Sequence, residues 1–368
     1  MEISSNVINL KKTDYGNNSL FLGQKLGLYD TIHKPHPEIL KLFQKLRAQD
    51  WDEFEFDFTS CALEFKTCSK NVHDILKITL AWLWEADTVA SRSIYAMTAP
   101  FITSDVLSRY WQKVSENESL HAATYSEILR GSFEENDVII QEVLSIKENS
   151  NRLKVVTDVL DETYIKGHQY ALGMVPNDQD LYNVIYKFNV AVLCLERIQF
   201  LNQFSVVAAV TKTTSFIPIG EAVKKICKDE FENHVRGIKT ILEIESKTPR
   251  GKLARTQLDD VIFNMINEVR LSEIEGAKFL FSEGRELTGL DCESLCKYVN
   301  YNSQDVFDFM GIKLPFERIK TNPLPFMNSW VVMDNTQSSP QESRGSNYLV
   351  SSVVNDMKDN FVIDITDL

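Results

Sequence analysis

Hydrophobic residues recur at spacings of three and four through most of the middle of the chain, which predicts long amphipathic helices. These stretches span residues 72–97, 103–129, 151–171, 180–210, 217–246 and 253–287. Between Glu38 and Ile217 the only prolines are Pro100 and Pro176, so strong helix breakers are rare there. Alternating strand patterns are sparse, and residues 52–58 (DEFEFDF) are the best candidate. Long helices packed side by side predict an all-α bundle.

Local signals suggest where some of these helices begin and end. Ser104 and Asp105 precede an apolar pattern and make a plausible helix start, because their side chains can cap free backbone N–H groups. Gly131 and Gly173 fall where helices are expected to end.

The composition is that of a chain with a substantial core and an acidic surface. Its 368 residues could form one large domain or two ordinary ones. The net charge of -13 argues against nucleic-acid binding, because phosphate contacts need an excess of Lys and Arg. We find no apolar run as long as a membrane span and no signal-peptide pattern in the first 30 residues. We therefore expect neither nucleic acid nor a membrane as a partner.

The six cysteines are scattered along the chain. This distribution suits reduced thiols in a cytoplasmic protein better than a disulfide framework. Cys292 and Cys296 lie four apart, but there is no second pair nearby to complete a zinc site.

Residues 334–368 differ from the rest of the chain. They are polar, Ser-rich and poor in periodicity, which predicts a flexible tail. Apolar islands at 348–350 and 361–365 are typical of segments that order on binding a partner, although an unused disordered end is the simpler alternative. We place the main domain at 1–333, with an extended N-terminal segment at 1–30, and the tail at 334–368.

The stretch ESLHAATY at 118–125 places a carboxylate, an imidazole and a phenol on one side of a predicted helix. Because each helical residue turns by about 100°, Glu118, His121 and Tyr125 share a face with Trp111. A Glu and a His three apart can bind one metal ion, and such pairs are a feature of di-iron carboxylate bundles. Taken alone, the pair is more simply explained as a solvated ion pair.

Three other predicted helices carry acidic residues beside apolar ones. Asp87 lies in LAWLWEADTVASR, Glu196 interrupts NVAVLCLERIQF, and CKDEFENH contains Glu230 and His234. A buried carboxylate is costly unless it is paired or binds metal, although each could instead lie at a helix edge and reach water. Four carboxylates and two imidazoles together suit a dinuclear non-haem iron site. The proposed ligands are Asp87, Glu118, His121, Glu196, Glu230 and His234.

Two other classes of protein fit parts of this pattern. A ferritin-like di-iron oxidase or iron-storage protein would use the same ligands without needing Tyr125. A metal-free helical scaffold that binds a partner through its tail would have to bury six polar side chains without an ion, which is energetically unfavourable.

Short segments in a characteristic order resemble one known family. They are FLGQ (21–24), DTVASRS (87–93), SLHAATY (119–125), LERIQF (195–200), CKYV (296–299), LPF (314–316), TNPLPFMNSW (321–330) and PQE with YLV (340–350). Over nearly the whole chain they resemble the small, radical-generating subunit of class I ribonucleotide reductase. The resemblance implies a ferritin-like helical bundle with a di-iron site in its core and a flexible C-terminal tail.

The resemblance also implies a role for the phenol. Tyr125 would be oxidised to a stable tyrosyl radical beside two Fe ions, held in an oxo-bridged di-iron centre in each chain. Phe200, Phe204 and Ile226 would wall the radical pocket, a role compatible with ordinary core packing. A Tyr at position 125 favours a di-iron cofactor over a manganese/iron one.

In this family the large subunit carries the substrate site, so this chain would supply an oxidising equivalent for reducing ribonucleotides to deoxyribonucleotides. The implied route runs from Tyr125 past His121, through Asp229 and Trp51, to Tyr348. Asp229 would orient His121 as a hydrogen-bond acceptor. Trp51 could instead be an ordinary core aromatic.

The resemblance further implies three partners. They are a second copy of the chain in a homodimer, the large catalytic subunit bound through the tail, and an electron donor that reduces the cluster. Glu342 and Tyr348 match the family's functional tail residues.

One ligand pair departs from the family's pattern. Glu230 and His234 lie four apart, where the family has three. A single π-type turn could absorb the extra residue and restore the direction of His234. Alternatively the helix is regular, and the four-spaced pair still shares one face.

Overall fold

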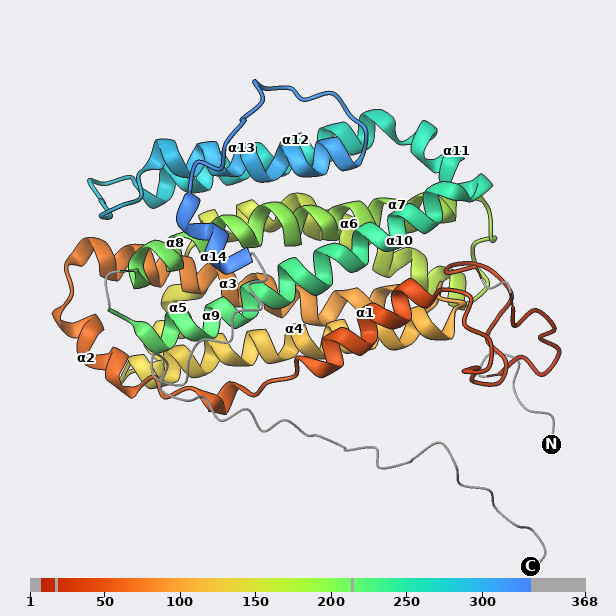
Figure 1. Ribbon diagram of the computed structural model, residues 1–368, viewed down its shortest axis with the longest axis horizontal. Helices are drawn as coiled ribbons and strands as arrows, with labels where there is room; N and C mark the ends of the chain where they lie inside the picture. The colour runs from red at the N-terminus through yellow and green to blue at the C-terminus, as the bar shows by residue number, and fades with distance from the viewer. Residues whose placement is uncertain (1–7, 17–18, 213–214, 332–368) are drawn as a thin grey trace, which may run out of the picture. The chain divides into compact units, whose positions relative to one another are not determined.

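The computed structural model describes residues 8–16, 19–212 and 215–331, which form an all-helical bundle (Figure 1). These residues lie in the first of two units, Met1–Asp334, into which the chain divides. The only bridges between extended segments in the described ranges are isolated ones, Phe21 with Ile102 and Leu287 with Leu290. The predicted all-α class is therefore confirmed.

Long helices make up the centre of the bundle. The single ones are α3 (Lys70–Thr98), α4 (Asp105–Ser132), α6 (Lys147–Ala171) and α12 (Asp259–Leu280). Two more are composite, each with a π-helix inserted between α-helical halves. They are α7 (Gln179–Cys194), η2 (Leu195–Phe200) and α8 (Leu201–Thr211), then α9 (Ile217–Asp229), η3 (Glu230–His234) and α10 (Val235–Lys247).

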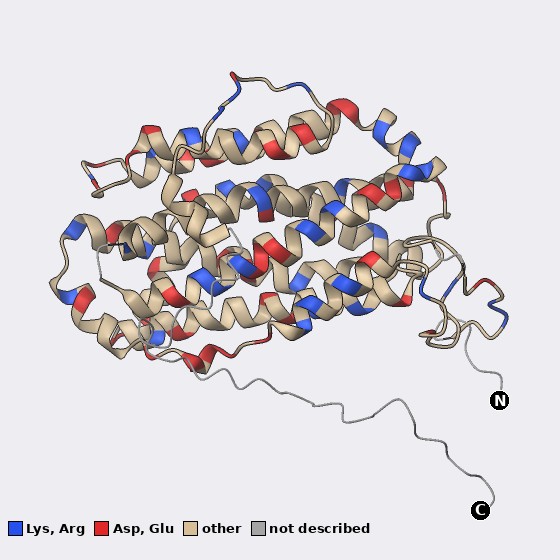
Figure 2. Ribbon diagram, viewed as in Figure 1, with Lys and Arg blue, Asp and Glu red and all other residues tan. Residues whose placement is uncertain are grey.

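Shorter elements surround them. They are α1 (Pro37–Ala48), η1 (Glu53–Glu55), α2 (Thr59–Thr67), α5 (Asn136–Leu144), α11 (Pro249–Gln257), α13 (Cys292–Phe309), η4 (Pro325–Met327) and α14 (Asn328–Val331). Helix α3 packs along α4 and against α6, and α8 packs on α9 and α3. Helices α12 and α13 pair with each other, and α12 also packs on α6 (Figure 1). Lys/Arg and Asp/Glu residues are interspersed along the helices (Figure 2).

Helix ends follow local chemistry in some places. Ser104 lies at the N-cap of α4, as predicted, but its side chain makes no capping hydrogen bond. Ser69 is the N-cap of α3, and its side chain accepts a hydrogen bond from the Val72 N–H at 3.3 Å. Gly173 follows α6 with a φ of 71°, a conformation that glycine adopts without strain, as predicted. Gly131 does not end α4, which continues to Ser132. Its missing Cβ instead makes room for Phe58, whose Cβ would lie 2.8 Å from a methyl group placed there.

Two predicted elements were wrong. Residues 52–58 form no strand, because Asp52 caps the short 3₁₀ helix η1 and Glu55 reaches back to the Asp52 N–H at 3.1 Å. The stretch 253–287 is broken at Leu258, and α12 ends at Leu280. Helices α1, α2, α5, α13 and α14 were not predicted.

The apolar run from Gln179 to Thr211 corrects a further expectation. Its 33 residues are long and apolar enough to cross a membrane. The most apolar part of the run is entirely buried inside the bundle, so the run is a core helix. A helix that is apolar on all sides is expected at the centre of a large helical domain.

A buried ion pair joins α6 and α12, and side-chain amides connect it to η2 and α8. Glu273 on α12 is fully buried and accepts hydrogen bonds from Arg152 on α6, 3.0 Å from Nε and 2.7 Å from Nη2. Three side-chain amides complete its surroundings, those of Gln199, Asn202 and Gln203 at 3.0, 3.0 and 3.4 Å. All partners of this carboxylate are therefore supplied by the protein.

We predict that Glu273→Ala destabilises the fold by about 3–5 kcal/mol, because it leaves Arg152 buried and unpaired. Chemical denaturation of the metal-free protein measures the change. Glu275→Ala is the matched control, since Glu275 is exposed and pairs with exposed Lys278, and its denaturation midpoint should stay close to that of the wild type. Equal midpoints for the two variants would contradict the prediction.

Candidate metal centre

Four helical segments bring all six predicted ligands to one place in the core. Asp87 comes from α3, Glu118 and His121 from α4, Glu196 from η2, and Glu230 and His234 from η3. Each of the six residues is fully buried. The six residues form two groups of four, because two of them belong to both groups. Within each group the ligand atoms lie within 4.8 Å of one another.

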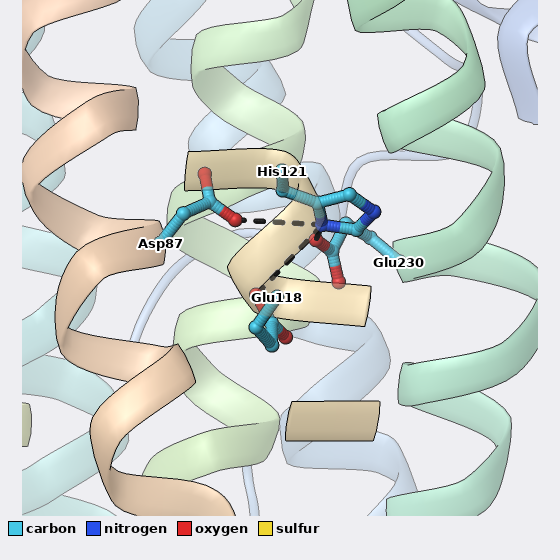
Figure 3. Close-up of side chains that lie close together, drawn as sticks. All are labelled: Asp87, Glu118, His121 and Glu230. Carbon is cyan, nitrogen blue, oxygen red and sulfur yellow. Dashed lines mark ion pairs between the residues drawn. The ribbon is translucent and has the colours of Figure 1, made fainter. Parts of the chain in front are cut away.

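The first group is centred on His121. Its Nδ1 lies 2.8 Å from Oε1 of Glu230, 3.5 Å from Oδ1 of Asp87 and 3.8 Å from Oε2 of Glu118. Figure 3 shows the three carboxylates converging on this nitrogen from α3, α4 and η3. One imidazole and three carboxylates around one point are hard ligands suited to iron or manganese.

The second group is centred on His234. Its Nδ1 lies 2.5 Å from Oε2 of Glu230, 2.9 Å from Oε1 of Glu118 and 3.9 Å from Oε2 of Glu196. Glu118 and Glu230 thus belong to both groups, with one oxygen of each facing either histidine. This arrangement fits two ions side by side, bridged by two carboxylates.

The ligand atoms of both groups lack hydrogen-bond partners among the described residues, which supports binding of two cations. Both oxygens of Asp87, Glu118, Glu196 and Glu230, and Nδ1 of His121 and His234, are buried without a hydrogen bond of acceptable geometry in the described protein. Buried polar atoms are nearly always satisfied, so a cluster of orphaned acceptors indicates a missing donor or ion. Cations would satisfy all of these atoms together.

The outward nitrogens of both histidines have protein partners. Nε2 of His121 lies 3.2 Å from Oδ2 of Asp229, and Nε2 of His234 lies 2.9 Å from Oδ1 of Asn117. The Asn117 amide also donates to Asp229, at 3.3 Å. Such partners fix the ring orientation and leave the other nitrogen free to bind metal. Asn117 was missed in the sequence, where nothing but its place before Glu118 marks it.

The spacing of Glu230 and His234 has its explanation in the backbone. Residues 230–234 form a π-helix, and the Val235 N–H bonds to the Glu230 carbonyl five residues back. The π-type alternative is therefore confirmed, and the regular helix is excluded. A second π-helix, η2, carries Glu196 and was not predicted.

The cluster perturbs the protonation of its own members. Burial raises the pKa of Asp87 and of Glu196. Burial also opposes ionisation of Glu230, but the charges of His234 and His121 outweigh it and lower the pKa of that carboxyl. Burial disfavours the charged imidazoles as well. The neighbouring carboxylates overcome this, raising the pKa of His121 and bringing that of His234 to about 10.

Tyr125 lies one helical turn after His121 and is fully buried. Its hydroxyl has no hydrogen-bond partner among the described residues. Burial, followed by the charges of Asp87 and Glu230, raises its pKa, so the phenol keeps its proton.

The predicted pocket residues are all in the core. Phe200, Phe204 and Ile226 are fully buried. Phe200 stacks on Phe204 with ring centroids 5.8 Å apart, and it forms a T-shaped pair with Trp82 with centroids 5.7 Å apart. Their role in walling Tyr125 remains a prediction.

Trp51 is connected to the cluster through Asp229. Its indole N–H donates to Oδ2 of Asp229 at 2.7 Å, the same oxygen that lies beside His121. The Trp51 and His121 rings also stack, with centroids 6.0 Å apart. The predicted residues Glu342 and Tyr348 lie outside the described residues, as does the whole of the predicted tail.

Comparisons with known proteins agree with this geometry. The family described as "Ribonucleotide reductase, small chain" matches residues 31–323. The ribonucleoside-diphosphate reductase subunit beta of Buchnera aphidicola (subspecies Schizaphis graminum) is 24% identical over 357 residues, covering 93% of this chain and 94% of that protein. The protein of the same name from Enterobacteria phage T4 is 20% identical over 382 residues and covers 98% of each chain.

Solved structures with low identity share the fold. The ribonucleotide reductase R2 subunit from Clostridium botulinum has a TM-score of 0.74 at 16% identity, covering 89% of this chain and 98% of that one. A dimanganese(II) protein from Streptococcus sanguinis has a TM-score of 0.64 at 14% identity, covering 82% and 98%. The family match spans well over half of the chain and agrees with the buried site for two metal ions. The chain therefore belongs to the family of the ribonucleotide reductase small chain, the beta subunit of ribonucleoside-diphosphate reductase.

Proposed function

We propose that this subunit binds two iron ions, forms a stable radical on Tyr125, and passes the oxidising equivalent to the large subunit for reduction of ribonucleotides. The observation that carries the proposal is the pair of four-ligand groups that share Glu118 and Glu230. The buried phenol of Tyr125 lies one turn after His121 on α4, and its hydroxyl has no partner among the described residues. A carboxylate-rich site suits iron, although the Streptococcus sanguinis relative is named as a dimanganese(II) protein.

Each ion would have its own imidazole. Asp87 and His121 would hold one, and Glu196 and His234 the other. Glu118 and Glu230 would bridge both. When bound, two iron ions and O₂ supply the oxidising power that the side chains lack. The four carboxylates balance the charge of two divalent cations, so the buried centre is close to neutral.

Tyr125 would lose one electron and its phenolic proton to become a neutral radical. Because burial and nearby carboxylates raise its pKa, the proton stays on the hydroxyl until the electron leaves. Phe200, Phe204 and Ile226 would keep water and reductants away from the radical, which supports a long lifetime.

The hydrogen-bonded series of His121, Asp229 and Trp51 supports an exit for the oxidising equivalent. Asp229 accepts from the Trp51 indole and lies beside His121, so its carboxylate could hold a proton as Trp51 is oxidised and reduced. From there we assign the next step to Tyr348, with Glu342, in a C-terminal tail at 334–368 that binds the large subunit.

The remaining assignments follow from the family. We propose a homodimer in the cytoplasm whose main domain spans 1–333, opening with an extended segment at 1–30. A separate electron donor would reduce the metal centre before each activation with O₂.

We predict that Tyr125→Phe keeps two metal ions but shows no tyrosyl radical after addition of Fe(II) and O₂. Paramagnetic resonance combined with metal counting measures both. Tyr186→Phe is the matched control, since Tyr186 is a buried phenol on α7 whose charged neighbours are Arg255 and Glu245, and it should give the wild-type signal.

A radical signal that survives in Tyr125→Phe would place the radical elsewhere. Wild-type protein that consumes O₂ with iron bound but never shows a radical would instead identify a ferritin-like oxidase or iron-storage protein.

Metal binding should release protons and weaken as the pH falls. The raised pKa values of His121 and His234 mean that both rings carry a proton near neutral pH before metal arrives, and binding must remove it. An indicator dye in weakly buffered solution measures the release when Fe(II) is added without O₂. His168→Gln, which alters an exposed histidine on α6, should release the same number of protons. Affinity that stays constant with pH would contradict this mechanism.

Deleting residues 340–368 should leave the radical intact and reduce turnover with the large subunit to background. Tyr348→Phe is the matched variant, because it keeps the tail and removes one phenolic hydroxyl. It should still bind the large subunit, whereas the deletion should not. Sedimentation and turnover assays separate the two effects, and normal turnover by the deleted chain would rule out this route.

A further inference from the structure

Tyr110 makes a long-range contact with the π-helix that carries His234. It lies on α4 and is fully buried, and its hydroxyl donates to the backbone carbonyl of Asn233 at 2.7 Å. Asn233 directly precedes His234 inside η3. A carbonyl oxygen has two lone pairs, so it can accept this bond in addition to a helical one.

The approach of Tyr110 depends on Gly237, the first glycine after the π-helix. A Cβ at that position would lie 1.7 Å from the Tyr110 hydroxyl oxygen and 2.4 Å from the ring carbon that bears it. Any larger residue would therefore push the phenol away. Glycine is otherwise unfavourable inside a helix, because its backbone loses more conformational freedom than that of any other residue. Tyr110 and Gly237 are therefore in close contact near the junction of η3 and α10.

The two histidine ligands differ in how their backbones are held. His121 sits within the regular helix α4. His234 sits at the end of a π-helix, where one extra residue widens the turn and sets the direction of the side chain. The His234 ring is surrounded by side chains: Nδ1 faces Glu118, Glu196 and Glu230, Nε2 bonds to Asn117, and the ring stacks on His121. The Tyr110 bond anchors the backbone one residue before the ring.

We infer that Tyr110 is a positioning residue for the second metal ion. Its hydroxyl packs against Gly237 and holds the π-helix in its observed register. This register directs the His234 ring toward Glu118, Glu196 and Glu230. The inference rests on the proposed two-metal function. Tyr110 is not itself a ligand in this scheme.

The chemistry of the phenol suits a fixed anchor. Burial, followed by the charges of Glu196 and Glu230, raises the pKa of Tyr110, so its hydroxyl remains a donor over the physiological range. Its ring also stacks on Trp111 with centroids 5.3 Å apart, which limits its freedom to turn away. Loss of the hydroxyl alone should therefore change one hydrogen bond and little of the packing.

The test is an anaerobic titration of metal-free protein with Co(II), followed by visible absorption and calorimetry. Wild-type protein should bind two ions per chain. Tyr110→Phe should bind one ion with wild-type affinity and the other about 10–100-fold more weakly, the range found when a group supporting a metal ligand is removed. With one Co(II) bound, its spectrum should match that of His234→Ala and differ from that of His121→Ala.

Two further variants separate positioning from general stability. Tyr182→Phe is the matched control, because Tyr182 is a buried phenol on α7 whose hydroxyl bonds to Glu245, and it should bind both ions normally. Gly237→Ala keeps the hydroxyl but displaces it, and should reproduce the selective defect of Tyr110→Phe. Thermal denaturation of the metal-free proteins should show that Tyr110→Phe is folded.

Tyr110→Phe that binds two ions with wild-type affinity would overturn the inference. So would equal weakening of both ions, since that would indicate a general packing defect. Wild-type protein that binds fewer than two Co(II) ions would instead refute the two-metal site on which the inference rests.

Discussion

The burial of four carboxylates in the middle of a helical bundle is the constraint on which the rest of this structure depends. Moving a carboxylate out of water costs far more than one hydrogen bond returns. Among the ligands of this cluster only the two imidazoles can carry positive charge, and the neighbouring carboxylates raise the pKa of both. Two divalent ions would offset the carboxylate charge and leave both imidazoles free to act as neutral ligands.

Glu273 is a buried carboxylate of the same chain that is stabilised in a different way. That carboxylate is equally buried, but Arg152 and three amides satisfy it with hydrogen bonds. The oxygens of Glu118 and Glu230 have no such partners in the described protein, although amide and guanidinium groups lie elsewhere in the core. The contrast indicates that the unsatisfied atoms are a property of a metal site rather than of buried acids in general.

The ligands could be predicted from the sequence because each one interrupts or flanks an apolar helical pattern. Since they lie on four predicted helices, it followed that these helices meet at one site. It left the geometry of Glu230 and His234 open, because a spacing of four suits both a regular and a π-type turn. Asn117 and Tyr110 gave no signal, since their partners lie more than 100 residues away. The expected strand at 52–58 failed because capping by Asp52 outweighed an alternating pattern.

Both composite helices carry their π-helix at a ligand, and η2 and η3 pack against each other. A π-helix is rare and persists only where its surroundings hold it in place. Here α-helices continue on either side of each π-helix, so the extra residue changes the direction of the ligands locally. A ligand pair spaced four apart, Glu230 and His234, can therefore face one buried metal site.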